Sequence, residues 1–328
     1  MSKLITVLIP IYNEEKNLPE LLFTLKKLSR GELHVERAPE KAVDVSPDLQ
    51  DYQWEFLFIN DGSTDNSLEV LLREREEDKR IKVIDLSRNF GKENALLAGL
   101  DYAKGDAVII MDADLQHPPE LIPEMVHYWE SGDEDVYCKR ANRDTDPLPR
   151  KILSNVFYRL LGSSSEIEMT PNAGDFRLLD RKVVDNLKNL REVNRYTKGL
   201  YSWVGFRKKE IPFEIRERTH GKSSFNLLKL TNLAVEGITS FSVTPLRLAT
   251  IVGFIVSLLA LFYIIFIIIK TLAFGETVQG FPTLMCAILF LGGLQLIALG
   301  IIGEYIGKIY NETKNRGVYI VRSINGEI

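Results

Sequence analysis

The sequence predicts an α/β fold with a parallel sheet covered by helices on both faces, followed by two membrane-spanning helices. Within residues 1–111, four short apolar runs alternate with helical patterns, which is typical of a parallel sheet. Polar and acidic residues follow each of these runs at its carboxyl end. Two uncharged runs, 249–269 and 281–303, are each long enough to cross about 30 Å of hydrocarbon as a helix.

Each element of the first part follows from its local pattern. LITVLIP (4–10) is an apolar strand, and 12–28 reads as a loop followed by an amphipathic helix. Residues 30–53 are charged, contain prolines and lack a period, so we expect an insertion or a long loop there. The later strands are expected at 54–60, 81–87 and 107–111, and the later helices at 67–76 and 91–103.

Composition narrows the class of protein. The chain has 328 residues, of which 45% are apolar and 26% charged, and this argues against disorder. A formal net charge of −4 gives no general sign of a nucleic-acid partner. Cys286 lies in the second apolar run and Cys138 far away in the polar part, so a disulfide is not expected and a reducing compartment fits.

The two uncharged runs predict transmembrane helices at about 248–270 and 281–303. Two buried helices of a soluble core are the alternative, but soluble helices normally carry a polar face. The linker 271–280 has no Lys or Arg, whereas basic residues follow the second run. The positive-inside rule then places a large N-terminal domain (1–224) and a tail (304–328) in the cytoplasm, which makes the chain a multi-pass protein of the plasma membrane.

Residues 225–245 lie between the domain and the first apolar run. Their apolar residues recur at helical spacing. A core helix is one interpretation, but the position just before a membrane span favours an amphipathic helix at the membrane interface. Two spans are too few to enclose an aqueous path, so we interpret the pair as an anchor.

Residues with functional chemistry gather where the predicted strands end. In a doubly wound sheet the carboxyl ends of the strands meet at one edge, and ligands bind there. Asp112 and Asp114 follow the fourth strand one residue apart, and they repel each other unless a cation lies between them. Mg²⁺ typically takes one or two carboxylates plus substrate phosphates. The residues expected at this edge are Pro10, Tyr12, Glu14, Asp61, Gly62, Ser63, Arg88, Asn89, Asp112 and Asp114.

Other readings of the acidic pair are weaker. A solvated pair in a turn would leave Asp61 and the later basic residues without a role. A haloacid-dehalogenase phosphatase also uses Asp-x-Asp after a strand, but near the first strand and with a different following residue. Neither a Walker loop nor a Gly-x-Gly-x-x-Gly motif is present, so phosphates are not held by those devices.

Several motifs in order carry a family resemblance. IPIYNEE (9–15), NDGSTDNS (60–67) and MDADLQHPPE (111–120) resemble the family 2 glycosyltransferases of GT-A fold. The later segments NAGDFRLLDRKV and RTHGKSSFN, the two apolar runs and GEYIGKIYNETKNRGVY resemble the polyprenyl-phosphate glycosyltransferases. That group includes dolichyl-phosphate mannose synthase and bacterial undecaprenyl-phosphate glucosyl- and N-acetylglucosaminyl-transferases. The resemblance covers nearly the whole chain except 30–53.

The resemblance implies a nucleotide-sugar donor, UDP-glucose or UDP-N-acetylglucosamine by analogy, and a polyprenyl phosphate acceptor. It implies that a divalent ion, Mg²⁺ or Mn²⁺, is held by Asp112 and Asp114, with Gln116 as a further contact. Residues matched to nucleotide-sugar binding are Pro10, Tyr12, Glu14, Asp61, Asp112, Arg140, Arg177, Arg195 and Lys222. RTHGKSSFN departs from the family pattern at Ser224 and Phe225, so the role of the family lysine moves to Lys222 or is absent.

An anionic acceptor has to be bound by cationic side chains. A phosphate monoester has its second pKa near 6, so its oxygen is already anionic at neutral pH and requires no strong base. Arginines are suited to offset the repulsion between this dianion and a diphosphate. Arg150 and Ser154 lie one helical turn apart and match the family's acceptor-phosphate pair, and Arg218 is a further candidate.

Some assignments stay open at this point. Asp175 stands where relatives with hydroxyl acceptors keep a base, but here it could instead position the acceptor or orient Arg177. Transfer to another lipid, such as diacylglycerol, is an alternative function, and a catalytically silent scaffold is another. The sequence specifies neither the sugar nor the oligomeric state, although the partners implied by the resemblance include the bilayer and leave a homo-oligomer open.

Overall fold

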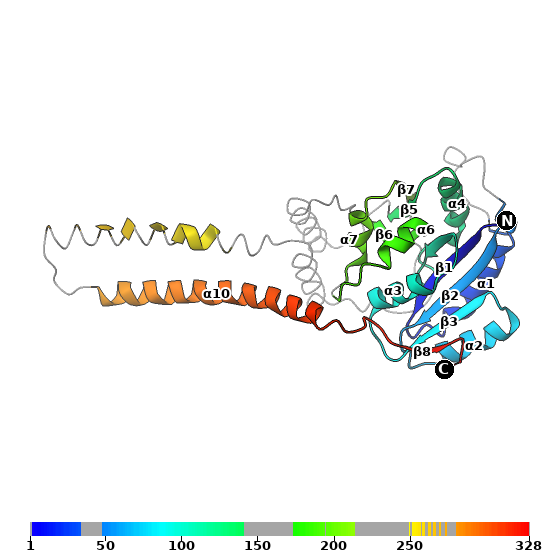
Figure 1. Ribbon diagram of the computed structural model, residues 1–328, viewed down its shortest axis with the longest axis horizontal. Coiled ribbons are helices and arrows are strands. Elements are labelled where there is room, and N and C mark those ends of the chain that lie inside the picture. Colours follow the sequence, from blue (N-terminus) through cyan, green and yellow to red (C-terminus); the bar gives the residue numbers. More distant parts are fainter. Residues whose placement is uncertain are drawn as a thin grey trace.

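A computed structural model describes residues 2–33, 48–140, 173–193, 195–213, 251–256 and 280–327, together with scattered positions from 249 to 273. An α/β domain forms one end of the molecule, and a long helix extends away from it (Figure 1). Most of the predicted insertion lies outside the described residues. Its last part contains a short 3-10 helix, η2 (Leu49–Asp51), which leads directly into a strand.

The described strands of the domain form one mixed sheet in the order β7-β5-β6-β4-β1-β2-β3-β8. The four predicted strands are confirmed, and they pair in parallel in the order β3-β2-β1-β4. The expectation of a purely parallel sheet is wrong, because β6 runs antiparallel to both β4 and β5. The strands are β1 (Leu4–Ile11), β2 (Gln53–Asn60), β3 (Ile81–Leu86), β4 (Ala107–Ile110), β5 (Asp135–Arg140), β6 (Ala173–Asp180), β7 (Lys208–Phe213) and β8 (Val321–Ile324).

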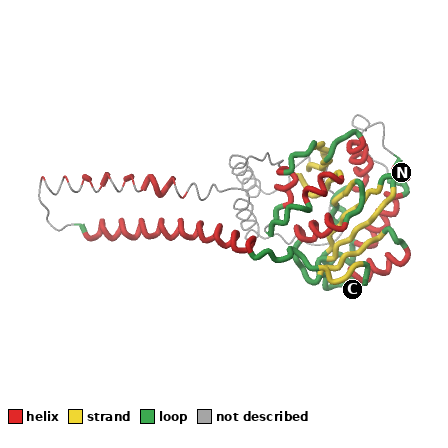
Figure 2. The backbone as a smooth tube through the Cα atoms, in the orientation of Figure 1, coloured by secondary structure: helices red, strands yellow, loops and turns green. Residues whose placement is uncertain are grey.

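Helices cover both faces of the sheet, as expected (Figure 2). Along β1, Val7 and Ile9 pack on the side of α1, α2 and α4, whereas Leu8 packs against α3, because successive side chains of a strand point to opposite faces. Both faces are therefore buried, which explains the nearly continuous apolar strands. The helices are α1 (Leu18–Ser29), α2 (Ser67–Glu77), η3 (Pro119–Leu121), α4 (Ile122–Glu130), α3 (Lys92–Tyr102), α6 (Arg181–Leu187) and α7 (Thr197–Trp203).

The strand order reverses between β1 and β4. From β1 the chain proceeds outward to β2 and β3, and it then returns to form β4 on the other side of β1. The loops after these two strands consequently diverge and leave a crevice at the carboxyl end of the sheet. The antiparallel direction of β6 brings its first residues to the same end, since Arg177 lies opposite Ile110 in the register.

The end of the chain returns to the domain. Strand β8 pairs antiparallel with β3 and completes one edge of the sheet. Asn325 binds Val83 through its backbone and side chain, and the Tyr319 hydroxyl donates to Asp101. The residues expected to form a plain cytoplasmic tail thus contain a strand of the catalytic domain.

Helix α10 (Phe281–Thr313) contains the second predicted span and continues ten residues beyond it, to Thr313. Within the described residues, the segment Phe290–Thr313 is the one stretch long and apolar enough to cross a membrane. Large apolar side chains along α10, such as Phe290 and Leu296, are exposed. In the first predicted span, the described positions, which include 251–256, are helical and mostly exposed. The predicted interfacial helix at 225–245 lies wholly outside the described residues.

Candidate active site

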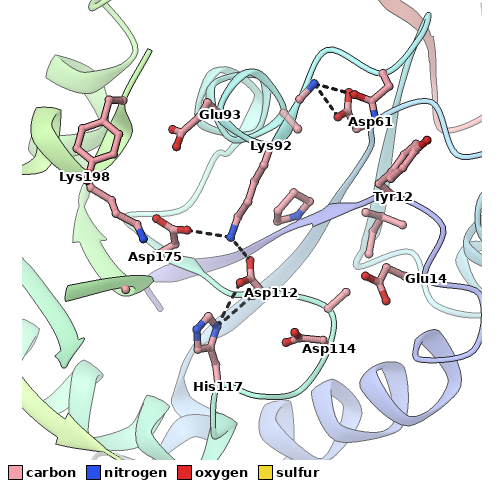
Figure 3. Close-up of a pocket in the computed structure, with 18 residues that line it drawn as sticks. Tyr12, Glu14, Asp61, Lys92, Glu93, Asp112, Asp114, His117, Asp175 and Lys198 are labelled. Carbon is pink, nitrogen blue, oxygen red and sulfur yellow. Dashed lines mark hydrogen bonds and ion pairs between the residues drawn. The ribbon is translucent and has the colours of Figure 1, made fainter. Parts of the chain in front are cut away.

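A cavity of about 710 Å³ opens at the crevice between β1 and β4. Its volume falls in the range usual for small-molecule sites. The predicted gathering of polar residues at this edge is observed, since residues following β1, β2, β3 and β4 all line the cavity (Figure 3). The lining residues are Pro10, Ile11, Tyr12, Glu14, Asp61, Asn89, Gly91, Lys92, Glu93, Ala95, Asp112, Ala113, Asp114, His117, Gly174, Asp175, Tyr196 and Lys198.

The loop after β1 is fastened to the loop after β2. The Asn13 N–H donates to the Ser63 hydroxyl at 3.0 Å, and the Thr64 N–H donates to the Asn13 side-chain oxygen at 2.7 Å. The Glu14 N–H donates to the hydroxyl of Ser67 at 2.9 Å. These contacts present Tyr12, whose side chain is 48% exposed, at the mouth of the cavity. The exposed ring offers a flat apolar surface on which a nucleobase can stack.

Asp61 and Gly62 position the loop after β3. Both carboxylate oxygens of Asp61 accept backbone N–H groups, from Phe90 at 2.7 Å and from Gly91 at 2.9 Å. Burial nevertheless raises the pKa of Asp61 above its ordinary value. Gly62 has φ +67°, and a Cβ there would lie 2.5 Å from the backbone carbon of Arg88. This glycine allows the two loops to pack backbone to backbone.

Lys92 lines the cavity, and its ammonium lies between two acidic residues (Figure 3). It is the first residue of α3, directly after the loop that Asp61 holds. Its ammonium lies 2.6 Å from Asp112 Oδ1 and 2.8 Å from Asp175 Oδ2. Three separate elements, α3, the loop after β4 and strand β6, therefore meet through one positive charge.

The charges at this junction stabilise one another. Burial opposes the charged form of Lys92, but Asp175 and Asp112 outweigh it and raise the pKa of the amine above its ordinary value. Burial likewise opposes ionisation of Asp175, but Lys92 and then Lys198 hold the pKa of that carboxyl well below its usual range. Asp175 is thus a carboxylate and Lys92 an ammonium at neutral pH. A carboxylate with so low a pKa is poorly suited to accept a proton.

Glu93 also lines the cavity and links α3 to another helix. Its carboxylate accepts both the backbone N–H and the hydroxyl of Thr197. These bonds tie α3 to the start of α7 and bring Tyr196 and Lys198 to the cavity. Burial, together with the nearby Asp175, raises the pKa of Glu93.

His117 supports the loop that carries the acidic pair. Its ring stacks on Phe176 with centroids 5.1 Å apart and meets Phe213 edge-on. Its Nδ1 accepts the Asp112 N–H at 3.4 Å, and burial lowers its pKa, which favours the neutral ring. This arrangement makes His117 a structural residue of the loop.

The acidic pair is suited to a metal ion that a bound phosphate ligand also coordinates. Asp112 and Asp114 both line the cavity, and the described residues contain no group of three or more acidic, His or Cys side chains that could enclose an ion by themselves. Mg²⁺ and similar ions are commonly held by one or two carboxylates together with substrate phosphates and water. The donor set therefore suits an ion shared with a diphosphate. Gln116 is not among the lining residues, and its backbone N–H donates to Asp114.

The predicted arginines divide into two groups. Arg177 and Arg195 do not line the cavity, so the prediction that they contact the nucleotide sugar is not supported. Arg177 is 3% exposed, pairs with Asp135 at 3.0 Å and stacks over Tyr201. Arg195 is buried and donates to the carbonyls of Leu187 and Leu190. Arg140 ends β5, and its side chain is not described; Arg150, Ser154, Arg218 and Lys222 lie outside the described residues.

Sequence reasoning did not place Lys92, Glu93 or Lys198 in the site. A signal for Lys92 was available. The helix dipole disfavours the positive charge of a lysine in the first turn of a helix. A lysine placed there, directly after a loop at the carboxyl end of the sheet, therefore suggests an anionic partner outside the helix. For Glu93 and Lys198 no comparable local signal exists, because their partners Thr197 and Asp175 lie on other elements, distant along the chain.

Comparisons with known proteins agree with this arrangement. A family model described as glycosyl transferase family 2 matches residues 6–188, and one described as GtrB C-terminal hairpin matches 244–309. A relative from Synechocystis, described as an uncharacterized glycosyltransferase, is 44% identical over 98% of this chain and 96% of its own. A prophage-derived bactoprenol glucosyl transferase from Shigella flexneri is 42% identical over 97% of each chain.

Solved structures resemble the chain more distantly. A mannosyltransferase from Pyrobaculum calidifontis in complex with GDP-Man and Mn²⁺ is 17% identical, with a TM-score of 0.43 over 68% of this chain and 59% of that one. A glucosyl-3-phosphoglycerate synthase from Mycobacterium tuberculosis in complex with Mn²⁺, UDP and phosphoglyceric acid is 18% identical, with a TM-score of 0.43 over 72% and 76% of the two chains. Similarity of this size does not transfer a ligand or a reaction.

Proposed function

Because the chain belongs to glycosyl transferase family 2, we propose that it transfers glucose from UDP-glucose to a polyprenyl phosphate at the membrane surface. The cavity at the β1–β4 crevice, with Asp112 and Asp114 on its wall, is the observation that carries the proposal. The bactoprenol glucosyl transferases, about 40% identical over nearly their whole length, favour glucose and a polyprenyl acceptor over the other choices.

The donor would bind with its base against Tyr12 and its diphosphate near the acidic pair. Asp112 and Asp114 would hold Mg²⁺ or Mn²⁺, which supplies positive charge for the departing diphosphate when bound. Charge stabilisation of this kind is often worth about 3–4 kcal/mol per well-placed group. Asp61 acts indirectly, because its carboxylate holds the loop that positions Lys92 in the cavity.

In the reaction, an acceptor phosphate oxygen would form a bond to the anomeric carbon of glucose. The bond from that carbon to the diphosphate oxygen breaks, and UDP leaves with the electron pair. The acceptor oxygen is already anionic, so no proton has to be removed. Asp175 fits this scheme as a permanent anion that orients Lys92. Attack opposite the leaving group inverts the anomeric configuration.

The test is to identify the labelled lipid. Membranes containing the full chain are incubated with Mn²⁺ and radiolabelled UDP-glucose or UDP-N-acetylglucosamine, with and without added undecaprenyl phosphate. The expected product is a glucose-labelled lipid whose amount rises with the added lipid phosphate. The variant Asp114→Asn should lose at least about 10²-fold in rate. Label on diacylglycerol, or no transfer to any lipid, would refute the proposal.

A further inference from the structure

Lys92 occupies a place where a metal ion would compete with it. Its ammonium is 2.6 Å from Asp112 Oδ1, an oxygen of the carboxylate assigned to the ion, and it lies on the same cavity wall. The side chain is 43% exposed, so it can move without repacking the core. The position at the start of α3 is one that the helix dipole disfavours for a cation. The two carboxylates must therefore hold the ammonium there.

We propose that Lys92 and the divalent ion compete for Asp112, so that the free enzyme binds the ion weakly until the nucleoside diphosphate arrives. The identity of the diphosphate rests on the proposed function. The competition itself depends only on Lys92, Asp112 and Asp175.

Charge balance explains the order of binding. In the ligand-free cavity, Lys92 already neutralises part of the charge of Asp112 and Asp175, and a second cation at Asp112 would be repelled by it. A diphosphate adds negative charge and oxygen ligands, which two aspartates alone do not supply. The ion can then displace the ammonium from Asp112 while Lys92 stays paired with Asp175. The ammonium, still paired with Asp175 but no longer with Asp112, can then approach an acceptor phosphate, which needs a counter-charge.

The competition predicts a gain of function in metal binding. Mn²⁺ is titrated into the full-length protein in detergent without nucleotide, and the free ion is followed by electron paramagnetic resonance. Lys92→Met should bind Mn²⁺ about 5–150-fold more tightly than the unaltered protein, the range of typical coupling between two sites. Lys79→Met is the matched control, because Lys79 is exposed on the turn after α2 and its loss changes the net charge equally. This control should leave Mn²⁺ affinity unchanged.

A double variant locates the site. Lys92→Met combined with Asp112→Asn should lose the gain, because the ion no longer finds the freed carboxylate. Circular dichroism checks the fold of each variant. If Lys92→Met is unfolded, Lys92→Gln is used instead, since glutamine keeps a hydrogen-bond donor between the two carboxylates without the charge.

The outcomes separate this inference from the proposed function. Unchanged or weaker Mn²⁺ binding by folded Lys92→Met or Lys92→Gln overturns the competition, as does an equal gain in Lys79→Met or a gain that persists in the double variant. If Lys92→Met gains Mn²⁺ affinity but the unaltered protein transfers no glucose, the proposed substrates are refuted and the competition stands. If the unaltered protein transfers glucose but the variant gains no Mn²⁺ affinity, the competition is refuted and the proposed substrates stand.

Discussion

Asp61 and Gly62, which begin the segment after β2, act mainly on the loop after β3. Asp61 was expected to contact the nucleotide, and it does line the cavity, but both of its oxygens are engaged by the backbone of Phe90 and Gly91. Gly62 lets this loop approach within contact distance. The motif therefore shapes the segment from which Lys92 projects.

Gly62→Ala should destabilise the domain and weaken donor binding. The added Cβ meets the Arg88 backbone at 2.5 Å, and the residue must keep φ +67°. We expect the free energy of unfolding to fall by about 1–3 kcal/mol, measured by denaturant titration, and the affinity for UDP to fall with it. Gly132→Ala is the control, because Gly132 has φ +99° but no atom within 4 Å of the added Cβ. Equal losses in both variants would contradict the role of close packing.

Asp175→Asn tests whether a base takes part. The asparagine keeps the shape but removes the anion beside Lys92. Because the acceptor brings its own charge, turnover should fall by about tenfold, less than the roughly 10²–10⁴-fold loss typical of a general base. Turnover is measured at saturating donor and acceptor. A loss of about 10³-fold or more in folded protein would instead favour a hydroxyl acceptor.

At the scale of elements, local pattern predicts the first half of the sheet well. Strands β1, β2, β3 and β4 lie within one or two residues of their expected bounds, because apolar runs buried on both faces and flanked by turns have few other interpretations. The meeting of their carboxyl ends follows from the alternation with helices. This part of the sequence therefore predicted the position of the cavity and most of its acidic residues.

The other half of the sheet depends on contacts that pattern does not encode. AGDFRLLD can form a strand in either direction, and only pairing with β4 makes β6 antiparallel and brings Asp175 next to Asp112. The four-residue strand β8 is short and half polar, and it exists through its pairing with β3. Lys92 falls within a good helix-forming run, so its partners on β6 and after β4 become visible only in three dimensions.

Removing residues 319–328 should destabilise the catalytic domain. The truncation deletes β8, exposes the edge of β3 and removes the Tyr319–Asp101 and Asn325–Val83 hydrogen bonds. Unpaired strand edges promote association between chains. We expect a midpoint of thermal unfolding several degrees lower and increased light scattering. Arg316→Ala, which changes an exposed residue before β8, should behave like the unaltered chain. A truncated chain with unchanged melting would contradict this role of β8.

At the scale of the whole molecule, the long helix and the catalytic domain are joined by direct contacts. Glu312, near the end of α10, accepts the backbone N–H of Val193. The cavity thus belongs to a domain that contacts the end of α10 at Val193 and contains β8, the strand that follows α10.

Cysteine labelling tests how α10 is oriented. Gly280 precedes α10 and Arg316 follows it, and both are exposed. In intact cells a membrane-impermeant maleimide should label Gly280→Cys, whereas Arg316→Cys should react only after the cells are permeabilised. This result is expected because basic residues follow the second apolar run and none lie in 271–280. Equal labelling of the two positions in intact cells would contradict a span between them.

The pairing of β8 with β3 constrains the number of membrane crossings. Both strands belong to one sheet, although all of α10 lies between them in the chain. A polypeptide that starts and finishes in the same sheet must traverse any intervening bilayer an even number of times. If α10 is one traversal, then the apolar stretch before it has to supply another. A short strand at the chain's end thereby sets the parity of the whole topology.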